Sequence, residues 1–128
     1  MSKAIIICGD RHWKDVGIID EYIRSLHSDT RVITGGGTGA DTIAENARIK
    51  YGLDGEVYDA NWTIFGRAAG PIRNRRMIIN EFPYLIVGFH DNISRSRGTR
   101  DTLLRAKRRG IQYQIRKSDG SVEYEPKL

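Results

Sequence analysis

Short apolar runs alternate along the chain with segments that have helical periodicity. The apolar runs predict strands at 3–8, 31–34, 56–60, 84–89 and 112–115. The amphipathic segments between them predict helices at 16–26, 41–51, 72–81 and 99–109. Strands that alternate with helices favour a mostly parallel sheet with helices on both faces. The pattern therefore predicts a Rossmann-like α/β fold.

Glycine and proline residues mark the ends of several predicted elements. Gly52 and Gly110 follow two of the predicted helices and suit C-terminal caps. Pro71 precedes the third helix and fits its first turn. The 84–89 run is apolar throughout, which predicts a central strand. The first helix is expected to bury one apolar face, formed by Val16, Ile19, Ile23 and Leu26.

The end of the chain has a different pattern. Asp119 and Gly120 stand between two alternating segments, which is typical of the turn in a β-hairpin. A length of 128 residues fits one domain. We expect a single Rossmann-like domain over residues 1–128, with its core at 3–112 and a terminal hairpin or tail at 113–128.

Residues that directly follow strands are the first candidates for a site, because open parallel sheets bind ligands at the carboxyl ends of their strands. Gly9 and Asp10 follow the first strand, and Gly9 allows a ligand to approach the backbone closely. Arg11 offers a planar guanidinium that suits a phosphate or a carboxylate. Trp13 is a candidate for stacking on a base.

The segment after the second strand is rich in glycine. It leads directly into a helix and consists of Gly35, Gly36, Gly37, Thr38 and Gly39. Such a backbone exposes N–H groups beside a helix N-terminus, which predicts phosphate or ribose binding. The segment is not a Walker A loop, and it follows the wrong strand for a dinucleotide fingerprint. Asp41 either caps the helix or takes part in binding.

Two later strand ends add small and basic residues. Arg73 and Asn74 are expected in the first turn of the third helix, where Arg73 would meet a phosphate and Asn74 would order a neighbouring loop. The start of the fourth helix predicts a second anion site, which faces the glycine segment across the sheet. Its residues are Ser96, Arg97, Gly98 and Thr99.

These motifs together resemble the YspA-like branch of the SLOG superfamily over about residues 3–112. The matching motifs are Gly9-x-Arg11, the segment 35–41, Ala69-Gly-Pro-x-Arg-Asn74 with Met77, and Ser96-x-Gly-Thr99. The superfamily includes LOG phosphoribohydrolases, the DNA-processing protein DprA and sensor domains for NAD-derived signals. The resemblance implies a Rossmann-like pocket for a nucleotide or a nucleotide-derived ligand.

One position departs from the LOG enzymes. Their motif Pro-Gly-Gly-x-Gly-Thr-x-x-Glu ends in a catalytic glutamate. The matching segment 94–102 retains Gly98 and Thr99 but has Thr102 in place of that glutamate. A threonine cannot supply the carboxylate for N-glycosidic hydrolysis, so LOG-type catalysis is not expected from this motif.

Composition and charge narrow the choice of partners. The net charge is +5, with seven basic and ten acidic residues in 1–60 and fourteen and six in 61–128. The single cysteine, Cys8, excludes a disulfide framework and fits a reducing compartment. No apolar run is long enough to span a membrane. We expect a cytoplasmic protein with no membrane partner, no metal and no cofactor.

Three classes of function stay open. The first is a sensor or sequestering module for a nucleotide-derived small molecule, such as an ADP-ribose-like ligand. The second is a nucleotide N-glycosidase whose catalytic residues are unknown; the substitute carboxylates would be Asp10, Asp41, Glu45 or Asp101. The third is nucleic-acid binding, which the sequence supports least, because aromatic residues are not interleaved with the basic ones. A homo-oligomer is expected from the resemblance alone.

Overall fold

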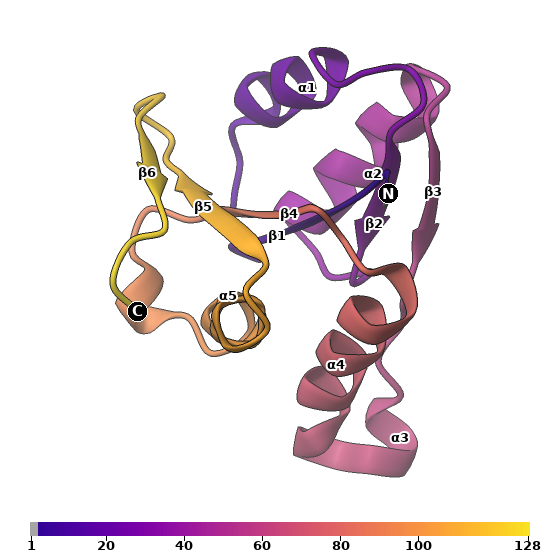
Figure 1. Cartoon of the computed structure of the whole chain (residues 1–128), viewed down its shortest axis with the longest axis vertical. Helices are drawn as coiled ribbons and strands as arrows, with labels where there is room; N and C mark the ends of the chain where they lie inside the picture. The colour runs from indigo at the N-terminus through magenta and orange to yellow at the C-terminus, as the bar shows by residue number, and fades with distance from the viewer. Residues whose placement is uncertain (1–2) are drawn as a thin grey trace.

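Six strands form one sheet in the order β3-β2-β1-β4-β5-β6 (Figure 1). The computed structural model describes residues 3–128. The strands are β1 (Ala4–Gly9), β2 (Arg31–Thr34), β3 (Asp54–Val57), β4 (Leu85–Phe89), β5 (Gln112–Arg116) and β6 (Val122–Tyr124). Strands β1 to β5 are parallel, and β6 pairs antiparallel with β5. The predicted Rossmann-like sheet with a C-terminal hairpin is confirmed.

Helices cover both faces of the sheet. One face packs against α1 (Val16–Arg24) and α2 (Ala40–Lys50), and the other packs against α4 (Ala69–Glu81) and α5 (Gly98–Arg108). The connections contain α3 (Trp62–Phe65) and two short 3-10 turns, η1 (Gly66–Ala68) and η2 (Ile93–Arg95). Within residues 3–128, no helix is long and apolar enough to cross a membrane.

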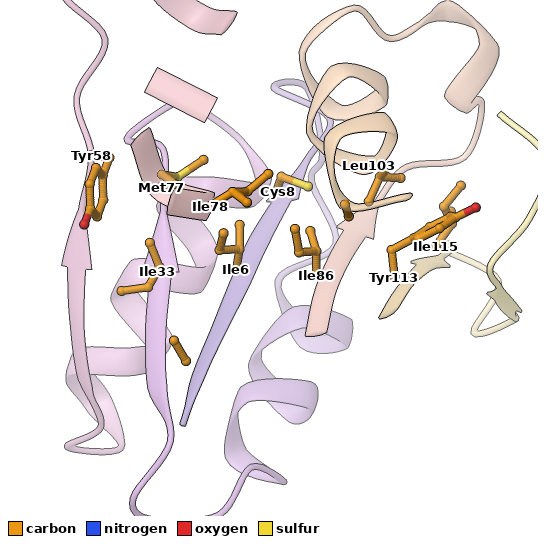
Figure 2. Close-up of a cluster of buried hydrophobic side chains, with 12 residues drawn as sticks. Ile6, Cys8, Ile33, Tyr58, Met77, Ile78, Ile86, Leu103, Tyr113 and Ile115 are labelled. Atoms are coloured by element: carbon orange, nitrogen blue, oxygen red, sulfur yellow. The ribbon is translucent and has the colours of Figure 1, made fainter. Parts of the chain in front are cut away.

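Alternating side chains of the central strands supply both halves of the core. Ile6 and Ile86 lie with Leu103 in the core half beneath α4 and α5 (Figure 2). Ile5 and Val87 lie in the other half, against α1 and α2. Successive side chains of a strand point to opposite faces, so a strand covered on both sides is apolar throughout. This confirms the prediction that the 84–89 run forms a central strand.

The structure corrects two predicted boundaries on the third strand and the third helix. Strand β3 begins at Asp54 and ends at Val57, so the predicted range 56–60 was displaced toward the C-terminus. As an edge strand β3 is polar and has no apolar run to mark it. Helix α4 begins at Ala69, so Arg73 and Asn74 lie in its second turn. Pro71 fits inside the first turn because the N–H groups there have no helical acceptor.

The structure also corrects the first helix. Helix α1 ends at Arg24, and Ile19 and Ile23 are its buried residues. Val16 is exposed, contrary to the prediction, because it directly follows the N-cap residue Asp15. Leu26 lies beyond the end of the helix but still packs against the core.

Two backbone segments are in direct contact at the carboxyl ends of β1 and β4. The N–H of Asp10 donates to Phe89 O at 2.9 Å, and Asp10 O accepts from Ala40 N at 3.1 Å. A Cβ at Gly9 would overlap Phe89 O. Gly39 has a φ of +67°, and a Cβ there would overlap Asp10 O. Both glycines are therefore required by close approach, and together they fix the start of α2 against β1.

An ion-pair cluster holds the end of α4 against β2 and β3. Arg31 Nε donates to Glu81 Oε1 at 2.8 Å, and Arg31 Nη2 donates to Glu56 Oε2 at 2.7 Å. Tyr58 OH donates to Glu81 Oε2 at 2.5 Å. Burial raises the pKa of Glu81, but the hydrogen bonds from Arg31 and Tyr58 outweigh burial and hold that pKa below its usual value.

The pKa of Glu81 predicts a loss of stability in acid. Because this pKa is lower in the folded protein than in the unfolded chain, the Glu81 contribution is present above the ordinary value of 4.5 and is lost as the pH falls through the folded value. Urea unfolding between pH 3 and pH 7 should show a smaller acid loss in Glu81→Gln than in the wild type. Glu21→Gln, at an exposed position of α1, should retain the wild-type profile. An unchanged acid loss in Glu81→Gln would contradict this role.

The close backbone approach predicts unequal effects of alanine at two glycines with similar φ. Gly39→Ala should lower the free energy of unfolding by roughly 2–4 kcal/mol, because it adds both backbone strain and overlap. Gly52 has a φ of +69° but nothing within 4 Å of an added Cβ. Gly52→Ala should therefore cost only about 1–2 kcal/mol. Equal losses for the two variants in chemical denaturation would show that the contact at Gly39 is unimportant.

Candidate functional site

The order of the strands reverses between β1 and β4. The chain proceeds outward from β1 to β2 and β3, and then returns to β4 on the other side of β1. In open α/β sheets, ligands bind beside such a reversal, at the carboxyl ends of the strands. The loops after β1 and β4 and the glycine segment before α2 meet at this edge. The structure therefore brings the sequence-predicted segments of β1, β2 and β4 to one edge of the sheet.

The glycine segment forms an exposed turn that is ordered by its own helix. Gly36, Gly37 and Thr38 are exposed, and Gly36 has a φ of +72°. Gly37 N donates to Asp41 Oδ2 at 3.0 Å, and Thr42 Oγ1 donates to Gly37 O at 2.9 Å. Asp41 thus accepts a hydrogen bond from the turn that precedes its helix. One of the N–H groups predicted to hold a phosphate is already occupied.

A pocket of about 220 Å³ lies beside this turn, between the first turns of α2 and the end of β3. Three buried oxygen atoms in its lining residues have no hydrogen bond of normal geometry within residues 3–128: Thr34 Oγ1, Asp41 Oδ1 and Glu45 Oε2. The carboxylate of Asp59 also lines the pocket and lies against Gly36. We call this the acceptor pocket, lined by Thr34, Asp41, Glu45 and Asp59.

The acceptor pocket has a distinct chemistry. Its lining contains three carboxylates and no Lys, Arg or His side chain. A buried acceptor without a partner costs roughly 1–3 kcal/mol, so a donor that reached one of these oxygens would be stabilised. Each of these oxygens is covered from solvent, so a donor reaches it only after the side chain turns toward the pocket. A phosphate would be repelled. Within residues 3–128, no group of His, Cys, Asp and Glu side chains is arranged to hold a metal ion.

Burial also affects the protonation of the pocket. It raises the pKa of Asp41, against the opposing effects of the Gly37 N–H, the charge of Arg73 and the Gly35 N–H. Glu45 is paired through its other oxygen, because Glu45 Oε1 accepts from Arg48 Nε at 2.9 Å. Asp41 and Glu45 lie one helical turn apart, so both present a carboxyl group from the same side of α2.

Arg11 lies next to the glycine turn on the outside of the acceptor pocket. Its carbonyl accepts from Thr38 Oγ1 at 3.2 Å, and its exposed side chain donates to the neighbouring His12 at 3.3 Å. None of the ion pairs within residues 3–128 involves Arg11. The two Nη groups of its guanidinium are therefore available to an anion.

Arg73 and Asn74 belong to a chain of hydrogen bonds across the sheet edge. Arg73 Nη1 donates to Gly35 O, and Arg73 Nε donates to Asn74 Oδ1 at 2.8 Å. Asn74 Nδ2 donates to Asp101 Oδ2 at 3.0 Å, and Arg105 Nε donates to the same oxygen at 2.8 Å. The chain joins the glycine segment to α5 through α4. Asn74 joins α4 to α5 rather than to a loop, and Arg73 uses its hydrogen bonds within the protein.

The start of α5 is capped in part by Ser96, which precedes the helix. Ser96 Oγ accepts from Thr99 N at 3.0 Å, and Thr99 is buried against Gly88. Arg97 and Gly98 remain exposed. Thr102 Oγ1 donates to Gly98 O at 3.1 Å and is buried, so its hydroxyl is used within the helix. The second anion site stays a prediction that rests on Arg97 and Gly98.

Two residues of the first loop have structural roles. Trp13 is 6% exposed. Its ring lies edge-on to that of Phe89, with 5.7 Å between the ring centroids, and its Nε1 donates to Asp15 O at 2.7 Å. Asp10 Oδ1 accepts from His12 N at 2.8 Å and shapes the loop. Trp13 therefore packs in the core, and its stacking on a base stays a prediction.

Sequence reasoning missed two residues of the acceptor pocket, Thr34 and Asp59. Thr34 is the last residue of β2, directly before the glycines. It was therefore assigned to the strand and not to the candidate site. Asp59 was hidden inside the strand predicted at 56–60, whereas it follows the observed end of β3. A rule that collects every polar residue at a strand end would have found Thr34, and a correct β3 boundary would have found Asp59.

Comparisons with known proteins agree with this architecture. No family model matches the chain. The solved structure of DNA processing protein A (DprA) from Streptococcus pneumoniae is similar with a TM-score of 0.70 and 17% identity. The match covers 89% of this chain and 49% of that one, so the chain spans about half the length of DprA. This similarity shows a DprA-like Rossmann fold, and membership of the YspA-like branch stays a prediction.

A curated relative has a similar length. The Gene 61 protein of Mycobacterium phage D29 is 30% identical over 119 residues, which cover 85% of this chain and 92% of that protein. The aligned segment covers nearly all of the relative. The protein belongs to the same family as the Gene 61 protein of Mycobacterium phage D29.

Proposed function

We propose that the protein binds a nucleotide or a nucleotide-derived ligand of the ADP-ribose type, as a sensor or sequestering module. The observation that carries this proposal is the acceptor pocket, where oxygens of Thr34, Asp41 and Glu45 are buried without partners. A ribose offers adjacent hydroxyl groups that donate hydrogen bonds to such acceptors. A volume of about 220 Å³ suits the sugar portion of a ligand rather than a whole dinucleotide.

The phosphate of the ligand would then lie outside the acceptor pocket. Gly36 and Gly37 of the exposed turn line the pocket, and the next residue, Thr38, donates to the Arg11 carbonyl. Backbone N–H groups at a helix start and a guanidinium both favour an anion. This arrangement separates the donors needed by phosphate from the acceptors needed by ribose. Arg73 supports the turn through Gly35 O rather than acting as the main phosphate ligand.

A second pocket supports this function less well. It has a volume of about 310 Å³ and lies between the end of α5, β5 and the C-terminal tail, with Tyr113 and Pro126 in its lining. Within residues 3–128, none of the unpartnered buried oxygens belongs to it. The larger volume therefore carries no comparable requirement for a ligand.

Calorimetry with AMP, ADP-ribose and NAD would test nucleotide binding, and analogues would test the placement of ribose. AMP should bind at least about tenfold more tightly than 2′,3′-dideoxy-AMP, because a hydrogen bond to a charged group contributes roughly 1.5–3 kcal/mol. Asp41→Asn should weaken AMP binding by a similar factor, because the amide oxygen would keep the bond from Gly37 N–H and leave the NH2 group, a donor, facing the ribose hydroxyl. Asp119→Asn, in the exposed β5–β6 turn, is the matched control.

The possible results separate two parts of the proposal. If none of the nucleotides binds the folded protein, the proposed function is wrong. If AMP and its dideoxy analogue bind equally, nucleotide binding stands, but the ribose does not occupy the acceptor pocket.

Hydrolysis of the ligand is a second candidate function, favoured by the carboxyl pair of Asp41 and Glu45. A carboxyl group whose pKa is raised by burial is suited to general acid catalysis. An N-glycosidase would release the free base from AMP, which chromatography of a long incubation detects. Base release that persists in both Asp41→Asn and Glu45→Gln would exclude this pair as the catalytic groups.

Nucleic-acid binding is the third candidate, since the solved structure with the same fold belongs to a protein named for DNA processing. The acceptor pocket does not favour it, because three carboxylates would face a phosphate backbone. Any nucleic-acid site therefore has to lie elsewhere on the molecule.

A further inference from the structure

An arm formed by α3, η1 and the start of α4 carries large apolar side chains without cover. We define the arm as residues 61–76; in Figure 1 it extends away from the sheet, with α3 at its far end. All residues from 61 to 68 are exposed. Trp62 is 59%, Ile64 70% and Phe65 47% exposed. Contiguous exposed apolar groups of this kind usually mark a binding surface.

The arm is also strongly basic. Between positions 60 and 80 the sequence contains four arginines, at 67, 73, 75 and 76, and no Asp or Glu. Arg67 and Arg75 are exposed, and no ion pair within residues 3–128 neutralises either of them. An anionic partner is favoured by these charges.

The aromatic and basic residues of the arm belong to consecutive short elements. A Cβ at Gly70 would come within 3.3 Å of Trp62 Cη2, so the indole lies against the first turn of α4. Arg67 is in η1, directly between Phe65 and that turn. The folded chain therefore groups exposed aromatic and arginine residues on one short arm.

We propose that the arm binds single-stranded nucleic acid, with bases stacked on Trp62 and Phe65 and phosphates paired with Arg67 and Arg75. Unpaired bases have free faces for aromatic stacking, whereas bases inside a duplex do not. A second copy of the chain fits less well. A twofold contact would bring the arms of both copies together, and each arm contains arginines without any acid.

This site is separate from the acceptor pocket proposed above for a nucleotide. The pocket is acidic and lined by residues of β2, α2 and the end of β3. The arm follows that strand end and carries the opposite charge. Nucleic-acid binding by the arm therefore does not depend on nucleotide binding in the pocket, and an excess of AMP should not displace an oligonucleotide.

Intrinsic fluorescence tests the stacking directly, because the chain has two tryptophans in opposite environments. Trp13 is 6% exposed and Trp62 is 59% exposed. Titration with a twenty-nucleotide oligo-dT at low salt should quench the fluorescence of Trp62. The logarithm of the affinity should fall with the logarithm of salt, with a slope of about −0.7 for each phosphate contacted.

Variants measured by anisotropy of a labelled oligo-dT identify the residues. Trp62→Ala with Phe65→Ala should weaken binding by at least about fivefold for each stacked base. Arg67→Gln with Arg75→Gln, at surface positions, should weaken binding and make the salt slope shallower by about 1.4. Tyr124→Ala removes an aromatic that is 74% exposed on β6 and should bind as the wild type does. Circular dichroism of each variant controls for folding.

Three results would overturn the proposal. The first is the absence of quenching and of any anisotropy change with folded protein at low salt. The second is unchanged affinity in both double variants, which would place the nucleic acid elsewhere. The third is a dimer in sedimentation that the Trp62→Ala and Phe65→Ala double variant disrupts, without oligonucleotide binding by the wild type. That result would identify the arm as a contact between copies.

Discussion

The contact between the backbone after β1 and the backbone before α2 determines the geometry of the candidate site. Asp10 donates its N–H to the end of β4 and accepts the N–H of Ala40 through its carbonyl. Gly9 and Gly39 have no Cβ at the two points where one would overlap a carbonyl oxygen. This contact fixes where α2 begins. It therefore also fixes where the first two turns of α2 present Asp41 and Glu45.

The balance of charge at this edge differs from what a glycine-rich turn suggests by itself. A helix N-terminus acts as roughly half a positive charge, and it attracts anions only over a short range. Asp41, Glu45 and Asp59 place three carboxyl groups beside that same turn, and one of them already accepts the N–H of Gly37. These acidic groups oppose the attraction of the helix dipole for an anion inside the pocket. The proposed anion site therefore lies outside the pocket, near Arg11.

Much of the fold could be predicted from sequence because both central strands are covered on two sides. Burial on both faces makes β1 and β4 apolar throughout, so their positions were correct, and Gly52 and Gly110 mark helix ends where φ is positive. Edge positions gave weaker signals. Strand β3 is polar and was displaced, and α3 buries no residue, so it produced no apolar periodicity.

The candidate site was predictable in position but not in detail. The strand-end rule selected the edge where the loops after β1 and β4 meet the glycine turn. The hydrogen bonds of Arg73 and the burial of Trp13 could not be predicted, because they depend on contacts between residues far apart in sequence. The same limit applies to the acceptor pocket. Its oxygens come from three separate segments of the chain. A linear sequence does not show which side-chain oxygens become buried without a hydrogen-bond partner.

The central claim is that the turn at Gly36 and Gly37 borders a ligand site. Titration of AMP into isotope-labelled protein, followed through backbone amide resonances, tests this claim most directly. The account predicts that the amide peaks of Gly36 and Gly37 shift with saturation, while that of Gly120 in the distant β5–β6 turn does not. Saturating shifts elsewhere, with Gly36 and Gly37 unchanged, would contradict it.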